Sequence, residues 1–535
     1  MRGISIYASK VLLAAALTFA PVACSSGAKS DGVPDGGGAP TGTAGVTGNG
    51  TVARTSCGPV GTRPGGALRA GDFPMQGFDA RRTGRVPYDG PTTAAVKWTY
   101  VFPTRGQDNA SPVVGRDGTI YQPTETGVFA LRPDGTLLWK NETPFLRIIR
   151  NAPVLSSDGT RLFVGSDNHI VALGTQDGTM SWIHDFVGDN SYSSLLTGPD
   201  GTIYFGSRVP AAMNAVSPNG SPKWRTIHCP PGDEPARFGI EGPAAMGLDG
   251  QLFVPSNCGG LTAFAGNGGG ARWNHEEGTI GLGYWQVPAV GDDGVVYYPG
   301  HDDGAGSGAA AFTPDGNKKW ATPDSQGGPG MLSGVALSWD GGTLYRAFAG
   351  QIEALNTETG ATRWRRAIAG KDVHFGGSPL LSANGILYWM GGDDLIYAAC
   401  ADDGTFLWKH HLESSTEVWG PQSPALAADG TLYVFSSGTP LSSGNLPGRL
   451  YAFGGAPVTT TGGAGAGGGA DGGADRTAAG GASTGSCMKL LACCDAATGA
   501  NKADCMTVYE EKVAEGGPAC AAAYQALGED FCPTP

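Results

Sequence analysis

Residues 354–364 read ALNTETGATRW, and the chain repeats the pattern of this stretch. Residues 172–182, ALGTQDGTMSW, are a second close copy. Tryptophans in phase with these copies recur at intervals of 41 to 49 residues. They are Trp98, Trp139, Trp182, Trp224, Trp273, Trp320, Trp364 and Trp408. A period of this size that is kept through eight units indicates one supersecondary unit repeated along the chain.

A turn dipeptide keeps the same phase. Asp-Gly, or Asn-Gly in one unit, begins at residues 117, 158, 200, 249, 293, 340, 384 and 429. Such dipeptides suit tight hairpins because their backbones accept positive φ. Short apolar runs lie around them, as at 119–121 and 128–131. We therefore predict four short strands in each unit, with the marker dipeptide between the first two.

A period of 40 to 50 residues with four strands per unit predicts an all-β fold, an eight-bladed β-propeller over residues 98–455. Independent hairpins or a β-sandwich are alternatives, but neither requires a constant period. We expect the repeated tryptophans to fill the gaps between blades. The eighth unit ends at Phe453 without a tryptophan, whereas Trp98 precedes the first complete unit. The strand around Trp98 is therefore predicted to complete the last blade and remove its exposed edge.

The N-terminus follows the pattern of an export signal. Arg2 and Lys10 are basic, and the apolar run 11–20 is too short to span a membrane. Residues 21–24 resemble a bacterial lipobox, so we predict lipidation of Cys24, with an ordinary signal peptide cut near Ala23 as the alternative. The expected location is the outer membrane or cell surface, and the face of that membrane stays open. The net charge of -13 argues against a nucleic-acid partner.

Composition divides the rest of the chain. Residues 25–56 are predicted to be a disordered tether, 57–97 a lead-in segment, and 456–486 a Gly- and Ala-rich linker. The tail, residues 487–535, is too short for a large core and is predicted to be a small α-helical domain held by three disulfides. A zinc site is the alternative, although the tail has no histidine. Its cysteines are Cys487, Cys493, Cys494, Cys505, Cys520 and Cys532.

Four more cysteines lie in the body, which an oxidising compartment would favour as disulfides. Cys229 and Cys258 flank the first two strands of one blade, and we predict that they pair. Cys57 and Cys400 have no local partner. They pair with each other if the lead-in folds back over the body, or remain free.

The repeat resembles the tryptophan-docking repeat of quinoprotein dehydrogenases and related propellers, over residues 98–455. The lead-in stretches 73–77 and 82–84 also look like the segment preceding such propellers. The resemblance implies one of two branches. One is enzymes that hold pyrroloquinoline quinone and Ca²⁺ in the propeller funnel. The other is non-enzymatic lipoproteins such as the propeller subunit of the outer-membrane β-barrel assembly machinery.

Chemistry-bearing residues favour the second branch. The enzymes often carry a vicinal Cys-Cys pair against the quinone, and the only such pair here, Cys493-Cys494, lies in the tail. No catalytic motif such as Gly-x-Ser-x-Gly occurs, and the Asp-Asp-Gly runs at Asp292, Asp302 and Asp402 suit hairpin turns better than Ca²⁺. We therefore expect no catalytic residues, no metal and no cofactor.

A ligand is expected at the rim of the central channel, where the outer strand of one blade connects to the inner strand of the next. Trp285 and Trp419 lie outside the tryptophan period and are the preferred contacts. The predicted set is Asp108, Asn109, Arg150, Asn151, Tyr192, Arg237, Glu241, Tyr284, Trp285, Gln286, His374, Trp419 and Gln422. This mixed polar and aromatic set suits a peptide strand or a glycan.

The sequence thus predicts a non-catalytic, monomeric envelope lipoprotein. Its propeller would bind a protein or glycan partner, with the membrane reached through a lipid anchor only. A quinone-dependent dehydrogenase and a structural cell-surface protein are the alternatives.

Overall fold

The computed structural model describes most of the chain between residues 56 and 454. Residues outside this description are 1–55, 59–60, 62–71, 106–109, 147–148, 150, 188–192, 209, 229–238, 241, 257–259, 269, 276–285, 302–307, 323–333, 349, 369–376, 392–393, 414–421, 439–445 and 455–535. The predicted signal peptide, Cys24, tether, linker and cysteine-rich tail therefore lie outside the described residues. No described helix is long and apolar enough to cross a membrane.

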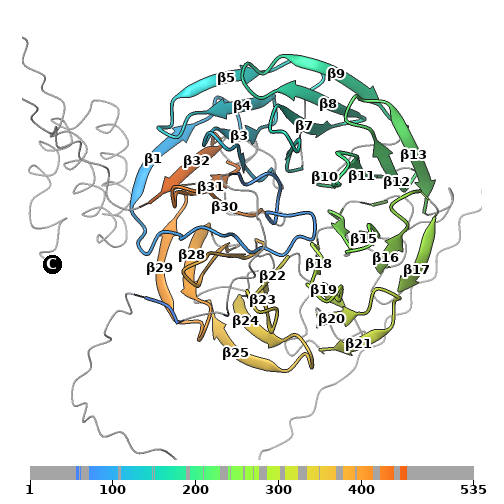
Figure 1. The fold of residues 1–535 in the computed structure, drawn as a ribbon. Coiled ribbons are helices and arrows are strands. Elements are labelled where there is room, and N and C mark those ends of the chain that lie inside the picture. Colours follow the sequence, from blue (N-terminus) through green and yellow to red (C-terminus); the bar gives the residue numbers. More distant parts are fainter. Residues whose placement is uncertain are drawn as a thin grey trace, which may run out of the picture. The chain divides into compact units, whose positions relative to one another are not determined.

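Eight four-stranded antiparallel sheets stand around a central axis (Figure 1). Blade 1 consists of β2 (Val113–Val114), β3 (Ile120–Pro123), β4 (Val128–Leu131) and β5 (Leu137–Asn141). Blade 2 consists of β6 (Val154–Leu155), β7 (Arg161–Ser166), β8 (His169–Gly174) and β9 (Met180–Asp185). Blade 3 consists of β10 (Leu196–Thr197), β11 (Ile203–Ser207), β12 (Ala212–Val216) and β13 (Pro222–Ile227), and blade 4 of β14 (Ala245–Met246), β15 (Leu252–Ser256), β16 (Gly260–Phe264) and β17 (Ala271–His275).

Blade 5 consists of β18 (Ala289–Val290), β19 (Val296–His301), β20 (Gly308–Phe312) and β21 (Lys318–Ala321). Blade 6 consists of β22 (Val335–Leu337), β23 (Thr343–Phe348), β24 (Gln351–Asn356) and β25 (Thr362–Ala367). Blade 7 consists of β26 (Leu380–Leu381), β27 (Ile386–Met390), β28 (Leu395–Cys400) and β29 (Phe406–His411), and blade 8 of β30 (Ala425–Leu426), β31 (Leu432–Ser436), β32 (Arg449–Phe453) and β1 (Val96–Val101). The predicted eight-bladed propeller with four strands per blade is confirmed.

Burial within a blade follows the position of the strand. The two-residue inner strands and the second strand of blade 1 are wholly buried, whereas outer strands such as β13 alternate exposed and half-buried residues. Middle strands are buried on both faces because each blade packs against two neighbours. The apolar core accordingly lies between blades, in clusters that each combine side chains of adjacent sheets.

Each repeated tryptophan joins its blade to the next one. In seven of the eight units the indole N–H donates to a backbone carbonyl of the following blade over 2.8–3.2 Å, as Trp320 does to Thr357 and Trp364 to Ala401. The ring lies against a glycine with positive φ in the same turn, such as Gly360. It also contacts an aromatic residue on the second strand of its own blade, such as Tyr297. The predicted role of these tryptophans in filling the gaps between blades is confirmed.

Glycine at the docking turn has two separable causes. An added Cβ at Gly360 would lie 2.7 Å from the Trp320 ring, and the backbone there has φ +73°. Gly159 has nearly the same φ, +74°, but an added Cβ would meet nothing within 4 Å. We predict that Gly159→Ala lowers the free energy of unfolding by about 1–2 kcal/mol through backbone strain alone. Gly360→Ala should cost about 1–3 kcal/mol more through overpacking.

Denaturant unfolding of the two glycine variants, beside the unaltered protein, measures the difference. Equal losses would contradict a steric requirement imposed by the tryptophan.

The last blade is closed by the N-terminal strand, as predicted. β1 pairs antiparallel with β32, placing Trp98 opposite Ala452. Because blade 8 takes its outer strand from the other end of the chain, it has no turn between its third and fourth strands. Pro91 of the lead-in supplies the carbonyl that this turn would offer, and it accepts from Trp408 Nε1 at 3.0 Å and from the Tyr388 hydroxyl at 2.9 Å.

This substitute turn explains the one Asn-Gly among the marker dipeptides. Asn384 Nδ2 donates to the Gly90 carbonyl at 3.0 Å, and Asn384 Oδ1 accepts from the Gly90 N–H at 2.9 Å. An aspartate has no hydrogen-bond donor when ionised, so it cannot make both contacts. The lead-in therefore requires asparagine at this marker position.

We predict that Asn384→Asp lowers the free energy of unfolding by about 1–3 kcal/mol, because the Gly90 carbonyl loses its donor and faces a carboxylate. Guanidinium chloride denaturation measures the loss. The matched control is Asp293→Asn in blade 5, where Oδ1 accepts the bond from the Val295 N–H, so an amide retains it. That control should stay within about 0.5 kcal/mol of the unaltered protein. A comparable loss in both variants would show that asparagine has no special role at residue 384.

A disulfide joins Cys57 to Cys400, 343 residues apart. The lead-in therefore folds back onto the body, and this decides between the two alternatives that the sequence left open for this pair. Closing so long a loop restricts the unfolded chain and contributes about 2–5 kcal/mol to stability.

Candidate functional site

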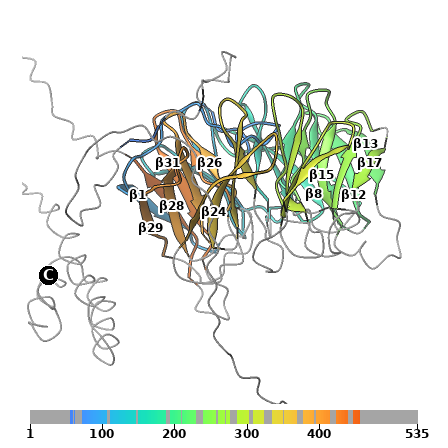
Figure 2. The ribbon, with the colours of Figure 1, turned by 90° about the horizontal axis from the view of Figure 1, so that it is seen from below.

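The lead-in lies across one end of the central channel. We call residues 72–91 the plug, and we call the face on which the plug and the marker turns lie the lower face; this face is toward the viewer in Figure 1 and at the top in Figure 2. Backbone N–H groups at the ends of six inner strands donate hydrogen bonds to plug carbonyls, with N···O distances of 2.7–3.0 Å. The donors are Val114, Leu155, Met246, Val290, Leu337 and Leu381, and their acceptors, in the same order, are Phe73, Pro74, Ala80, Arg81, Thr83 and Gly84. The plug thus occupies the hub of the ring on its lower side.

Arg82 is a buried cation at this hub. Its backbone has φ +57° and its side chain is fully buried. Nε donates to the Ala244 carbonyl at 3.1 Å, and Nη2 donates to the Leu195 carbonyl at 3.0 Å. Burial lowers the pKa of Arg82 to about 10, opposed by the charge of Asp79, so the guanidinium stays charged at neutral pH. Backbone carbonyls of blades 3 and 4 thus hold the cation that centres the plug.

Asp292 fixes the plug to blade 5. Its carboxylate accepts from Arg85 Nη1 at 2.9 Å and from Arg81 Nη1 at 2.6 Å. Burial would raise the pKa of Asp292, but the hydrogen bonds and charges of the two arginines outweigh burial and lower this pKa. The first Asp of this Asp-Asp-Gly run therefore binds the lead-in.

On the upper side of the plug, residues just before the inner strands contact one another between neighbouring blades. We call Ser111, Asn151, Ala152, Ser193, Ser194, Gly242, Gln286, Gly334, Ser378, Gln422 and Ser423 the inner ring. Ser111 Oγ accepts from the Ser423 N–H at 2.9 Å, and Ser194 Oγ accepts from the Ala152 N–H at 3.2 Å. A Cβ at Gly334 would come within 2.2 Å of Ser378 Oγ, so a small residue is required there.

Three predicted rim residues, Asn151, Gln286 and Gln422, belong to the inner ring and are buried. Asn151 Nδ2 donates to the Gly165 carbonyl of its own blade at 3.3 Å. Gln286 Oε1, by contrast, has no hydrogen-bond partner within the described part of the chain. Their role in binding a ligand stays a prediction. The other ten lie outside the described residues: Asp108, Asn109, Arg150, Tyr192, Arg237, Glu241, Tyr284, Trp285, His374 and Trp419.

Sequence reasoning missed the serines of the inner ring and the burial of Arg82. A signal for the ring was present, because a proline comes directly before the inner strand in five of the eight units, at residues 112, 153, 288, 379 and 424, and two residues before it in a sixth, at residue 243. Proline restricts the residue before it to extended backbone, which suits a chain entering a strand. Nothing comparable marks Arg82, whose burial depends on how the plug crosses the hub.

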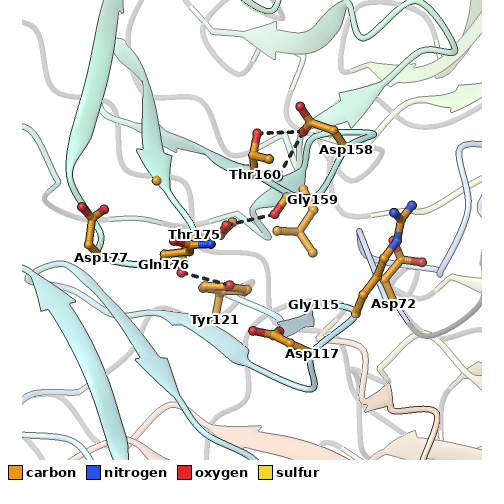
Figure 3. A pocket seen from close by; sticks show the side chains of 13 residues that line it. Asp72, Gly115, Asp117, Tyr121, Asp158, Gly159, Thr160, Thr175, Gln176 and Asp177 are labelled. Atoms are coloured by element: carbon orange, nitrogen blue, oxygen red, sulfur yellow. Dashed lines mark hydrogen bonds and ion pairs between the residues drawn. The ribbon is translucent and has the colours of Figure 1, made fainter.

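A cleft of about 560 Å³ lies on the lower face between blades 1 and 2 (Figure 3). Asp72 of the plug, Asp117, Asp158 and Asp177 line it with Arg116. Hydrogen bonds from Ser156 and Thr160 lower the pKa of Asp158 to about 2. Asp117, Asp158 and Asp177 hold their own turns, and Asp72 pairs with Arg116. No group of three or more His, Cys, Asp or Glu residues in the described part of the chain could hold a metal ion.

The described residues of the inner ring show whether this ring could hold a quinone and Ca²⁺. Their side chains are hydroxyls, amides and hydrogen or methyl groups, none of them a carboxylate, and the hub below carries the Arg82 guanidinium. Ca²⁺ prefers carboxylate-rich oxygen sites. The described ring therefore does not fit a calcium-bound cofactor.

Cys229 and Cys258 lie outside the described residues, but their neighbours are in contact. His228 Nε2 lies 2.9 Å from Ser256 Oγ. Burial lowers the pKa of His228, which favours the neutral ring in this contact. His228 and Ser256, the described residues on the N-terminal side of the two cysteine segments, therefore lie side by side, and the pairing of Cys229 with Cys258 stays a prediction.

A sequence model of the family described as outer membrane protein assembly factor BamB matches residues 206–378. No curated protein sequence matches the chain. Among solved structures, quinohemoprotein alcohol dehydrogenase from Comamonas testosteroni is 16% identical with a TM-score of 0.56, over 75% of this chain and 83% of that one. A europium-containing methanol dehydrogenase is 14% identical with a TM-score of 0.57, over 71% and 98%. BamB from Moraxella catarrhalis is 14% identical with a TM-score of 0.48, over 67% and 97%.

The ion pairs of Asp292 predict an acid-sensitive plug. A carboxylate whose pKa is lowered on folding adds stability above its unfolded pKa, near 4, and this stability is lost as the pH falls through the folded pKa. Asp292 is half exposed, so we expect Asp292→Asn to lower the free energy of unfolding by only about 1 kcal/mol at pH 7. The difference between unaltered protein and variant should shrink at pH 3.

Hydrogen exchange locates this effect. The amide of Val290, which donates to Arg81 of the plug, should exchange faster in Asp292→Asn, whereas Val114 in blade 1 should change less. Equal acceleration at both amides would contradict a local attachment.

Proposed function

Because the propeller is built of pyrroloquinoline-quinone-like repeats, we propose that the protein is a non-catalytic binding module of the cell envelope, whose upper face takes a protein or glycan partner. The observation that carries this proposal is the plug. It covers the lower end of the channel with hydrogen bonds to six inner strands and a buried arginine. A partner at the hub would therefore approach from the upper face, where the connections between blades lie.

The upper face suits binding more than chemistry. The inner ring beneath it offers neutral donors and acceptors, and Ser378 Oγ and Ser423 Oγ have no partner within the described part of the chain. Aromatic residues of the connections, Trp285 and Trp419, would supply contact area for a peptide or a sugar. In protein interfaces a few aromatic anchors commonly carry most of the binding energy.

The envelope location of the proposal comes from the ends of the chain. Residues 1–24 have the export pattern, Cys24 would carry the lipid, and residues 25–56 would be a tether. The six cysteines of the tail would form a small helical domain in an oxidising compartment. The match to the BamB family model supports an envelope role in general.

A quinone-dependent dehydrogenase is the second candidate. The fold likeness to quinohemoprotein alcohol dehydrogenase favours it. Fold alone does not decide activity, because function depends on the residues of the site. The lack of carboxylates in the described inner ring is the reason that binding is preferred.

We expect Trp285→Ala/Trp419→Ala to weaken binding of the mature protein to immobilised, detergent-solubilised bacterial envelope proteins by at least about tenfold, the loss typical of an aromatic hot spot. The apparent Kd, measured by biolayer interferometry, is the readout. Phe406→Ala is the matched control, since Phe406 is an exposed aromatic residue on the outer strand β29, away from the hub.

An assay of dehydrogenase activity tests the alternative function. The protein is mixed with pyrroloquinoline quinone and Ca²⁺, and alcohol-dependent reduction of a dye is followed. Clear turnover would overturn the non-catalytic proposal. Unchanged binding in the double tryptophan variant would overturn the upper-face site.

A further inference from the structure

The Cys57–Cys400 disulfide stands between the N-terminal end of the chain and every element that closes the propeller. Along the sequence, Cys57 comes first, the plug follows at 72–91, and β1 follows at 96–101. We propose that this disulfide diverts tension applied at the N-terminus into blade 7 and so keeps it from the plug and the closing strand. In the envelope such tension would come from the lipid anchor, a source that rests on the proposed function.

The residues around the disulfide attach the entering chain to the lower face. The Gly58 N–H donates to Asp402 Oδ2 at 3.1 Å, next to the turn that follows β28. Gly61 has φ +95°, and a Cβ there would lie 2.7 Å from the Asp340 side chain in blade 6. The chain thus contacts blades 7 and 6 before it reaches the hub.

Cys400 is a firm point of attachment. It is fully buried at the end of β28, which pairs with β27 on one side and with β29 on the other. A force on this sulfur acts on a central strand of a four-stranded sheet. Moving that strand requires several ladder hydrogen bonds and the packing between blades to fail together.

The plug and the closing strand would resist the same force poorly. The plug is held by backbone hydrogen bonds to successive blades, so a pull on its N-terminal end would load and break them one after another. β1 is an edge strand with one hydrogen-bonded neighbour, β32. Peeling these two elements would expose the edge of blade 8 and remove the Pro91 carbonyl from Trp408.

The covalent path settles which element carries the load. With the disulfide formed, residues 58–399 lie inside a closed loop, and tension between the two ends of the chain passes through the Cys57–Cys400 bond. Both the plug and β1 lie inside this loop. β32, the neighbour of β1, lies outside it and is loaded from the C-terminal end with or without the bond, so only a step that appears when the bond is removed reports on the plug and β1. Without the bond, the same tension reaches residue 72 first and β1 next.

Force spectroscopy on the full-length mature chain, held at its two ends, tests the proposal without any partner or lipid. In Cys57→Ser, which leaves the buried Cys400 thiol in place, we expect an early low-force step as residues 72–101 peel away. At about 3.5 Å per residue that step is about 100 Å long. The unaltered protein should lack it, and its fully extended length should be shorter by about 1,200 Å, the length of the closed loop.

Two further arms make every outcome decisive. If Cys57→Ser does not fold cooperatively, the unaltered protein is pulled with and without a phosphine reductant, which opens the same bond. Cys229→Ser/Cys258→Ser is the control, because a bond within one blade would leave the path through Cys57 unchanged. An early 100 Å step in the oxidised protein, or its absence after the bond is removed, would overturn the proposal. Failure of the binding test above would leave this result unaffected.

Discussion

The hydrogen bond from each outer-strand indole to a carbonyl of the next blade is the contact on which the ring depends. It fixes where a blade sits against its neighbour, as Trp320 does through Thr357, and it requires a glycine with positive φ beneath the ring. The aromatic residue on the second strand, such as Tyr297, supports the indole from behind. A single blade could not bury these surfaces, so the eight units are stable only together.

Circular closure makes one of the eight contacts different. The chain has two ends, and both meet in blade 8, so the turn that should receive Trp408 is absent there. The lead-in replaces it with Pro91, and Asn384 holds Gly90 with a donor and an acceptor. The same segment then explains the buried Arg82 and the paired Arg81 and Arg85, because a strand-like peptide crossing the hub brings its side chains among backbone carbonyls and turn carboxylates. Closure and plugging of the channel are thus one structural event.

This arrangement separates the two faces of the ring. The lower face is committed to closure through the plug, the marker turns and the Cys57–Cys400 disulfide. The upper side of the hub carries the inner ring, whose described side chains include serines and amides. The fold is shared with quinone-dependent alcohol and methanol dehydrogenases at 14–16% identity, a level at which likeness concerns architecture. The hub of this chain holds the Arg82 guanidinium and, among the described inner-ring residues, neutral side chains.

Several features could be predicted from the amino-acid sequence alone. They are the number of blades, the four strands in each, the tryptophan contacts between blades and the closing role of the strand around Trp98. These properties depend on a period and on turn chemistry, which are local and repeated eight times. Other features became known only from the folded structure. The lead-in crosses the hub, Arg82 is buried there, and Cys57 pairs with Cys400. Asn151, Gln286 and Gln422 are buried in the inner ring. Each of these features brings together residues that are tens to hundreds of positions apart in the sequence. Each also occurs only once in the described structure. A feature without a repeat leaves no pattern in one sequence, and packing at the axis alone determines it.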